Sequence, residues 1–173
     1  MNALQQKFPT QIQTILAKYP PDKQASAVMP LLYLAQAETG FVSQQSIQDI
    51  AAIVGLSSTD VDALIGYYTL YHDSPAGRYR LQVCTDLPCA LRGAEDFMHS
   101  LCANMGIKVG ETTPDGLITI EEVTCLAGCH RAPIFQVQGD GEITYHENQS
   151  VETALALVAE LRQRAARKEV NNG

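Results

Sequence analysis

Residues 78–89 carry the sequence RYRLQVCTDLPC. Polar and apolar residues alternate through residues 78–83, and this alternation predicts a β-strand whose end delivers Cys84. In residues 89–105 the apolar residues, Leu91 among them, recur at helical spacing, which predicts a helix that begins at Cys89. A strand that leads through a cysteine-bounded turn into a helix is typical of the first half of an α/β layer.

The rest of this second part continues in the same way. A strand is predicted at residues 117–123, a hairpin at residues 133–138 and 142–146 across a glycine-rich turn, and a last helix at residues 151–165. This order of elements resembles a thioredoxin-like fold. Four basic residues crowd the end of the last helix, where they suit a helix C-terminus: Arg162, Arg164, Arg167 and Lys168.

The part of the chain before residue 76 has a helical pattern instead. Apolar residues line one face of residues 8–19, and Ser26, Ser43 and Ser57 or Ser58 are candidate N-caps for three further helices. Gly40 and Gly55 are candidate C-caps for two of these helices. The turn-rich segment 73–77 then separates an N-terminal helical bundle, residues 1–76, from the α/β part, residues 77–173.

Composition excludes several classes of protein. The 173 residues carry a net charge of −7, which argues against a nucleic-acid partner. No apolar run approaches the roughly 20 residues of a membrane-spanning helix. Residues 1–18 lack a basic segment followed by an apolar one, so we expect a soluble chain without a secretory signal or direct membrane insertion.

The five cysteines are the feature that needs an explanation. Cys84 and Cys89 have the spacing C-x4-C, and Cys125 and Cys129 have the spacing C-x3-C. Without a secretory signal the thiols stay reduced, so paired cysteines indicate a metal or catalysis more than a disulfide. Two close pairs can converge at one edge of a sheet, and each pair can serve one iron of a 2Fe-2S cluster.

Spacing alone leaves two metal centres open. The chain has no C-x2-C dithiol and no C-x4-C-x2-C run of the plant-type ferredoxins. A four-cysteine zinc site can use the same thiolates, although a two-residue spacing is commoner there. The spacing favours the 2Fe-2S cluster over zinc and does not exclude zinc.

Two residues near the pairs have simpler interpretations. Cys102 shares a helical face with Met98 and Met105, so we expect a buried core residue. His130 directly follows Cys129, but a cluster with histidine ligands needs two of them, so we expect an exposed loop residue.

Four stretches carry a family resemblance. They are residues 29–43 (MPLLYLAQAETGFVS), 66–71 (GYYTLY), 75–84 (PAGRYRLQVC) and 125–133 (CLAGCHRAP). In this order they resemble the E-type subunit of NADH-quinone oxidoreductase, the enzyme that is also called respiratory complex I. Relatives commonly carry glycine where this chain has Ala127, so the backbone of the loop before Cys129, and the reduction potential with it, are expected to differ.

The resemblance implies a fold and a ligand set. It implies an α/β chain with a thioredoxin-like 2Fe-2S ferredoxin domain preceded by an N-terminal helical bundle. It also implies one 2Fe-2S cluster, whose ligands are Cys84, Cys89, Cys125 and Cys129. No residue is assigned a catalytic role.

The resemblance implies a function as well: an electron-transfer subunit of NADH:quinone oxidoreductase, in a cytoplasmic complex peripheral to the inner membrane. Four cysteine ligands leave no open coordination position, and the chain has no GxGxxG or GxxxxGK[ST] motif. FMN and NADH are therefore expected on a partner subunit, on which the helical bundle is expected to dock. The alternatives are the equivalent subunit of an NAD-linked formate dehydrogenase or bidirectional hydrogenase, and a zinc-bound structural module.

Overall fold

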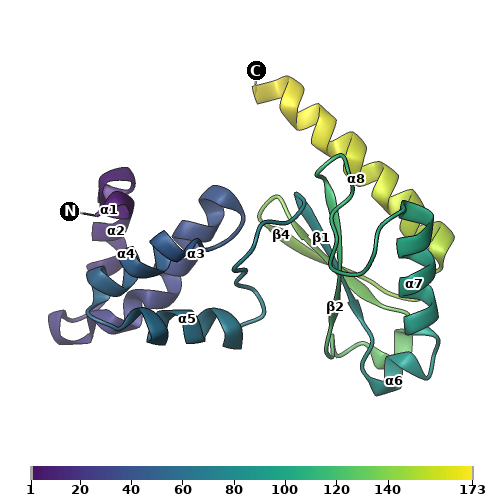
Figure 1. Cartoon of the computed structure of the whole chain (residues 1–173), viewed down its shortest axis with the longest axis horizontal. Coiled ribbons are helices and arrows are strands. Elements are labelled where there is room, and N and C mark those ends of the chain that lie inside the picture. The colour runs from purple at the N-terminus through teal and green to yellow at the C-terminus, as the bar shows by residue number, and fades with distance from the viewer. Residues whose placement is uncertain (1, 173) are drawn as a thin grey trace. The chain divides into compact units, whose positions relative to one another are not determined.

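The computed structural model describes residues 2–172 of the chain, and their side chains as far as residue 168. The chain forms two compact units, Met1–Pro75 and Ala76–Gly173, which we call the helical unit and the α/β unit (Figure 1). Each unit buries an apolar core of its own. The α/β unit also holds a small separate cluster around Cys84 and Cys89.

The helical unit contains one more α-helix than the four that the sequence predicts. Its elements are α1 (Ala3–Lys7), α2 (Pro9–Leu16), a 3-10 helix (Pro21–Ala27), α3 (Val28–Thr39), α4 (Gln44–Val54) and α5 (Ser58–Tyr67). Helix α1 has five residues, too few to show a periodic pattern. The apolar faces of these helices meet in one core, in which Leu31, Ile50 and Val61 are fully buried.

The helix ends test the predicted caps. Ser43 accepts a hydrogen bond from Ser46 N at 3.1 Å, and Ser57 accepts one from Asp60 N at 3.1 Å, so both predicted caps are confirmed. Gly55 ends α4 with φ of +73°, a conformation that favours glycine. The prediction for Ser26 is wrong. The 3-10 helix runs directly into α3, and the cap position is Ala27, which offers no side-chain acceptor.

A buried carboxylate attaches α1 to the rest of the helical unit. Asp49 on α4 is 5% exposed, and its Oδ2 accepts a hydrogen bond from Leu4 N at 2.9 Å. The Asn2 side chain adds a bond to the backbone oxygen of Asp49 at 2.8 Å. A backbone N–H at the start of a helix has no partner within the helix, and here a residue distant in sequence supplies one.

The α/β unit is a four-stranded sheet with helices packed against it. Its elements are β1 (Tyr79–Cys84), α6 (Leu87–Ala90), α7 (Ala94–Met105), β2 (Ile118–Val123), a 3-10 helix (Cys129–Arg131), β3 (Phe135–Gly139), β4 (Glu142–His146) and α8 (Val151–Asn172). The strand order is β2-β1-β3-β4. Strands β1 and β2 run parallel, whereas the β1–β3 and β3–β4 pairs are antiparallel. The predicted α/β class is confirmed.

The two faces of β1 have different chemistry. Tyr79, Leu81 and Val83 join the apolar core that α7 and α8 complete, and Figure 1 shows both helices on one side of the sheet. Arg80 and Gln82 alternate with them, and both side chains bond Glu121 of the neighbouring strand β2. All six residues of β1 are buried, so both faces of this central strand are covered.

Two predictions about helices in this unit are wrong. The helix expected over residues 89–105 is broken, because Gly93 has φ of +83° and separates α6 from α7. The break turns Leu91 outward, where it is 80% exposed, although the helical pattern places it in the core. Helix α8 also extends beyond the predicted end, so the basic residues do not lie in its last turn. Arg162 pairs with Asp115 at 2.7 Å instead, and Lys168 pairs with Asp140 at 3.1 Å.

The segment between the units ends at a closely packed glycine. A Cβ at Gly77 would lie 2.7 Å from the backbone carbon of Leu117. Gly77 N also donates a hydrogen bond to Thr119 Oγ1 at 2.7 Å. The chain is therefore fixed to the sheet from Gly77 onward.

In the described part of the chain, no single helix has both the length and the apolarity to cross a membrane. Helices α4 and α5 would satisfy those two criteria together, but the chain bends by 117° between them. Their apolar side chains, such as Ile47 and Ile65, lie in the core of the helical unit.

Candidate metal centre

The parallel pairing of β1 and β2 brings the two cysteine pairs to one edge of the sheet. Cys84 is the last residue of β1, and its partner in register is Val123, the last residue of β2. Cys125 follows two residues later, and Cys129 begins the next 3-10 helix. The carboxyl ends of parallel strands open at the same edge, so both pairs lie at the α6 end of the sheet (Figure 1).

Three of the four predicted ligands lie close together. Cys84 and Cys89 belong to one buried cluster, and Cys129 packs against it. Cys84 and Cys89 are fully buried, among Ala94 and Ile134. Burial, followed by the neighbouring Cys84 and Cys129 thiols, raises the pKa of Cys89 to about 12. Without a cation, this site therefore keeps Cys89 protonated.

The fourth predicted ligand is placed differently. Cys125 is exposed, and its Sγ accepts a hydrogen bond from Ala127 N at 3.3 Å. Among the side chains that the structure describes, residues 2–168, no three His, Cys, Asp or Glu are arranged to enclose a metal ion. Cys125 lies in the same short loop as Cys129, four residues before it.

That loop has an unusual backbone. Ala127 has φ of +57°, the left-handed region that favours glycine. The next residue, Gly128, is buried, and a Cβ there would lie 2.4 Å from Ile134 Cδ1. Gly128 therefore stands where a side chain has no room, whereas Ala127 adopts a backbone conformation that glycine would adopt more easily.

The donor set fits a metal centre. Burial holds the Cys89 thiol protonated by raising its pKa, and a thiophilic cation that binds this thiol would release the proton and offset the burial of charge. Cys84 and Cys89, with Cys129 packed against them and Cys125 in the same loop as Cys129, would supply four sulfur ligands. Iron and zinc both accept this set.

Residues near the pairs take structural places. Cys102 is buried in the core between sheet and helices, as predicted, and burial followed by the charge of Glu111 raises the pKa of its thiol. His130 is exposed, also as predicted. Sequence reasoning missed the N–H group of Ala127 as a sulfur donor, and only the backbone conformation of the loop reveals it.

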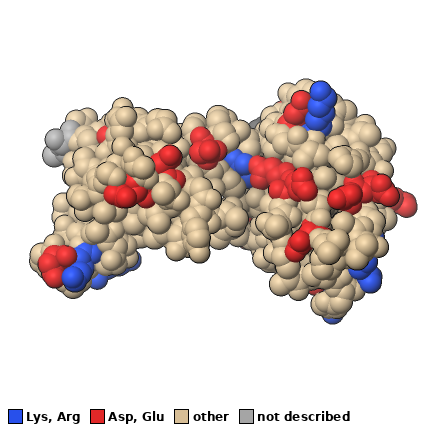
Figure 2. Space-filling model, turned by 60° about the horizontal axis from the view of Figure 1, so that its bottom comes forward, with Lys and Arg blue, Asp and Glu red and all other residues tan. Residues whose placement is uncertain are grey.

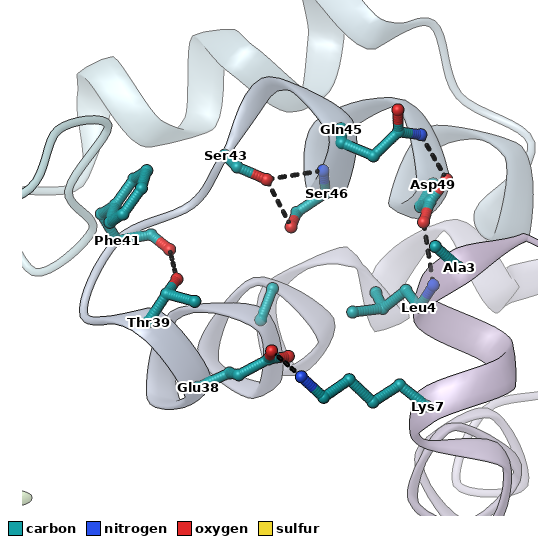
Figure 3. Close-up of a pocket in the computed structure, with 11 residues that line it drawn as sticks. Ala3, Leu4, Lys7, Glu38, Thr39, Phe41, Ser43, Gln45, Ser46 and Asp49 are labelled. Atoms are coloured by element: carbon teal, nitrogen blue, oxygen red, sulfur yellow. Dashed lines mark hydrogen bonds and ion pairs between the residues drawn. The ribbon is translucent and has the colours of Figure 1, made fainter.

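A pocket lies away from the cysteines, in the helical unit (Figure 3). Lys7 pairs with Glu38 at its edge, Ser43 bonds Ser46, and Asp49 bonds Leu4 and Gln45. These polar groups thus serve the packing of α1 against α3 and α4.

Comparison with known proteins identifies the family. A model of the thioredoxin-like [2Fe-2S] ferredoxin family matches residues 12–162. The chain belongs to this family. The match spans most of both units, so this ferredoxin shares most of its helical unit, as well as its sheet, with the family.

The curated relatives are subunits of NADH dehydrogenase complexes. The ferredoxin is 39% identical over 145 residues to NADH-quinone oxidoreductase subunit 2 of Thermus thermophilus, covering 84% of this chain and 80% of that one. It is 38% identical over 152 residues to an E-type NADH-quinone oxidoreductase subunit of Rhizobium meliloti, covering 88% of this chain and 87% of that one. The predicted resemblance is confirmed.

Among solved structures, a crystal structure of an NAD+-reducing [NiFe]-hydrogenase shares the fold. The TM-score is 0.60 at 17% identity, and the match covers 78% of this chain and 23% of the hydrogenase chain. At that identity the likeness concerns the fold alone.

Proposed function

We propose that this ferredoxin is the one-electron carrier subunit of an NADH:quinone oxidoreductase complex. Its single 2Fe-2S cluster would be held by Cys84, Cys89, Cys125 and Cys129. The observation that carries the proposal is the packing of Cys84, Cys89 and Cys129 in one cluster at the carboxyl edge of the sheet. The cluster, when bound, supplies reversible storage of one electron.

The protein around the cysteines suits such a carrier. Burial of Cys84 and Cys89 excludes water from the inner side of the site. The exposed position of Cys125 leaves the outer side open, where another protein can approach. Ala127 N–H donates to the Cys125 sulfur, and such bonds stabilise negative charge on cysteine ligands.

The electrons must come from another chain. The sequence has neither of the glycine-rich nucleotide motifs, so this chain has no visible NADH site. The relatives are subunits of NADH-quinone oxidoreductases, which supports a partner that binds FMN and NADH and exchanges electrons with this cluster. We place the assembled complex at the cytoplasmic side of the inner membrane, with this subunit peripheral to it.

The experiment that tests the proposal is anaerobic purification of the full chain. We expect a red-brown protein with two irons per chain that bleaches with dithionite and gives an EPR signal when reduced. Addition of the FMN-binding subunit and NADH should bleach the same absorption. A colourless protein with one tightly bound zinc ion would contradict the cluster, and a cluster that stays oxidised beside the reduced partner would contradict the role.

The helical unit has its own place in the proposal. It holds none of the five cysteines, so we assign it to docking on the partner. A chain shortened to begin near Asp73 should then fail to join the complex. Normal assembly of the shortened chain would contradict this assignment.

A further inference from the structure

Two exposed leucines bracket α6, the short helix that carries Cys89: Leu87 begins the helix, and Leu91 directly follows it. Leu87 is 69% exposed and Leu91 is 80% exposed. Leu91 N donates a hydrogen bond to Leu87 O at 3.0 Å, so the turn is helical and the two side chains share one face, with Cβ atoms about 5–6 Å apart. Each leucine that stays in water lacks about 1.5–3 kcal/mol of the stabilisation that burial would give. This favours a partner protein that buries both side chains.

The leucine face lies close to the cysteines. Cys89 is two residues from each leucine, so it points to the opposite side of the same turn, and its side chain is fully buried. A protein that covers the leucines is therefore separated from the Cys89 side chain by about one helix diameter, roughly 10 Å. Because electron tunnelling weakens steeply with distance, this is a favourable place for an electron-exchange partner.

Acidic side chains border the leucines. Asp86 caps α6 through a bond from Leu87 N at 2.9 Å, Glu95 and Asp96 lie in the first turn of α7, and Glu122 bonds Thr85 beside the end of β1. Arg92 is the single basic residue in residues 85–96. Figure 2, which turns the bottom of Figure 1 forward, shows both acidic and basic groups on the α/β unit.

We propose that these residues form a docking surface of the α/β unit for the FMN-binding subunit, beside the docking assigned to the helical unit, and that the partner presents an apolar patch bordered by Lys and Arg. The α6 surface consists of Leu87, Leu91, Asp86, Glu95, Asp96 and Glu122. The charge decides the occupant, because a second copy of this chain would bring the same acidic border and be repelled, as would an anionic membrane. This inference rests on the proposed function and names the residues that would recognise its partner.

The first test removes the apolar centre. The holo form of Leu87→Ser/Leu91→Ser is titrated with the FMN-binding subunit, beside wild type and the control Ile143→Ser/Tyr145→Ser. The control removes two large apolar side chains of β4 that are 41% and 57% exposed. We expect the leucine variant to raise the Kd about tenfold or more, and the control to leave it within about twofold. Equal binding by all three proteins, or an equal loss in both variants, would overturn the proposal.

A cluster spectrum accompanies each titration. The leucine variant should keep the absorption and EPR spectra of the wild type, because both leucines point away from the thiols. Loss of the cluster in this double variant would instead mean that the leucines support the fold. The titration is then repeated with the single variant Leu91→Ser, because Leu91 lies just beyond α6. Wild-type binding by Leu91→Ser would overturn the proposal, whereas failure of the wild type itself to bind the FMN-binding subunit would defeat the proposed function.

The second test addresses the acidic border. Association of the holo ferredoxin with the same subunit should slow as ionic strength rises, since salt screens attraction between opposite charges. In Glu95→Gln/Asp96→Gln this salt dependence should become shallower while the cluster spectra stay unchanged. An unchanged or steeper salt dependence would contradict a basic border on the partner.

Discussion

The two units of the molecule are built from contacts of different range. In the helical unit, Ser43 and Ser57 cap the starts of α4 and α5, and Gly55 ends α4, each within a few residues of its own position. In the α/β unit, the cysteine site needs β1 and β2 to pair across residues far apart in sequence. A chain can therefore specify a scaffold locally and still need its whole topology to build a site.

Each unit also contains one aspartate whose largely buried carboxylate ties distant segments together. Asp49 in the helical unit accepts bonds from Leu4 N and the Gln45 amide, both of which are neutral. Asp140 in the α/β unit accepts bonds from Arg78, Tyr79 and Lys168. The hydrogen bonds of Asp49 are therefore insensitive to salt, whereas the contacts of Asp140 are ionic. Variants of these two aspartates separate the two contributions to stability.

The largest effect is expected at the cysteines, which only the α/β unit possesses. Replacement of Cys84, Cys89, Cys125 or Cys129 by Ser should abolish or severely damage the cluster, because hard hydroxyl oxygen is a poor substitute for thiolate. Iron content and EPR of the purified variants measure this. Cys102→Ser is the matched control, with a normal spectrum and a loss of only about 1–2 kcal/mol of stability from a buried hydroxyl.

The next largest effect is expected at Asp140. Burial alone would raise its pKa, but hydrogen bonds from Tyr79, Lys168 and Arg78 lower the pKa to about 2. Asp140→Asn should lower the free energy of unfolding by about 2–3 kcal/mol at neutral pH, because it leaves Arg78 and Lys168 without their carboxylate. Asn still tolerates the left-handed backbone of this turn, so the variant isolates the charge.

The pH dependence gives this prediction a second measurement. A folded pKa below the ordinary 3.8 means that the unfolded chain binds the proton more readily. The stability from Asp140 is thus fully present above pH about 4 and is lost as the pH falls through about 2. Denaturation of wild type and Asp140→Asn should converge over this interval, and a constant difference would contradict the assigned role.

A smaller effect is expected at Asp49. Asp49→Ala leaves the Leu4 N–H without its acceptor and should cost about 1–3 kcal/mol. Hydrogen exchange should show faster opening in α1 and α4, with β1 and β2 unchanged. If the sheet loosens as well, the two units are not independent in stability.

The smallest effect is expected in the cysteine loop. Ala127→Gly relieves a left-handed alanine and should stabilise the protein by about 1 kcal/mol, less the entropy that glycine adds to the unfolded chain. The reduction potential of the cluster should shift with it, since Ala127 N–H bonds the Cys125 sulfur. Gly128→Ala is the opposing control, because its Cβ would displace Ile134. Equal effects of both changes on melting temperature would contradict this account.

Local signals explain which features the sequence could predict. Ser43, Ser57 and Gly55 act within a few residues of themselves, and the alternation around Leu81 needs only its own strand. The apolar pattern does not reveal the break at Gly93, because Leu91 fits the apolar face of one continuous helix as well as it fits a separate short helix. Periodicity records spacing, and it cannot tell which side a short helix presents to solvent.

The site itself was only partly accessible from the sequence. Two cysteine pairs predict a common centre, but the burial of Cys89 and the exposure of Cys125 depend on how β3 and the loop pack against β1. The same holds for Arg162 and Lys168, whose carboxylate partners come from turns that the helix pattern does not reveal. Contacts between distant segments decided each of these points.

The parallel pairing of β1 with β2 also sets an order of events during biogenesis. Cys84 and Cys89 leave the ribosome well before Cys125 and Cys129, and until β2 has paired they are two thiols without a second pair. On the proposed ligand set, cluster insertion must wait for the finished sheet, so that iron loading reports on correct folding. The bound cluster in turn would hold the strand ends together and protect the completed fold against unfolding.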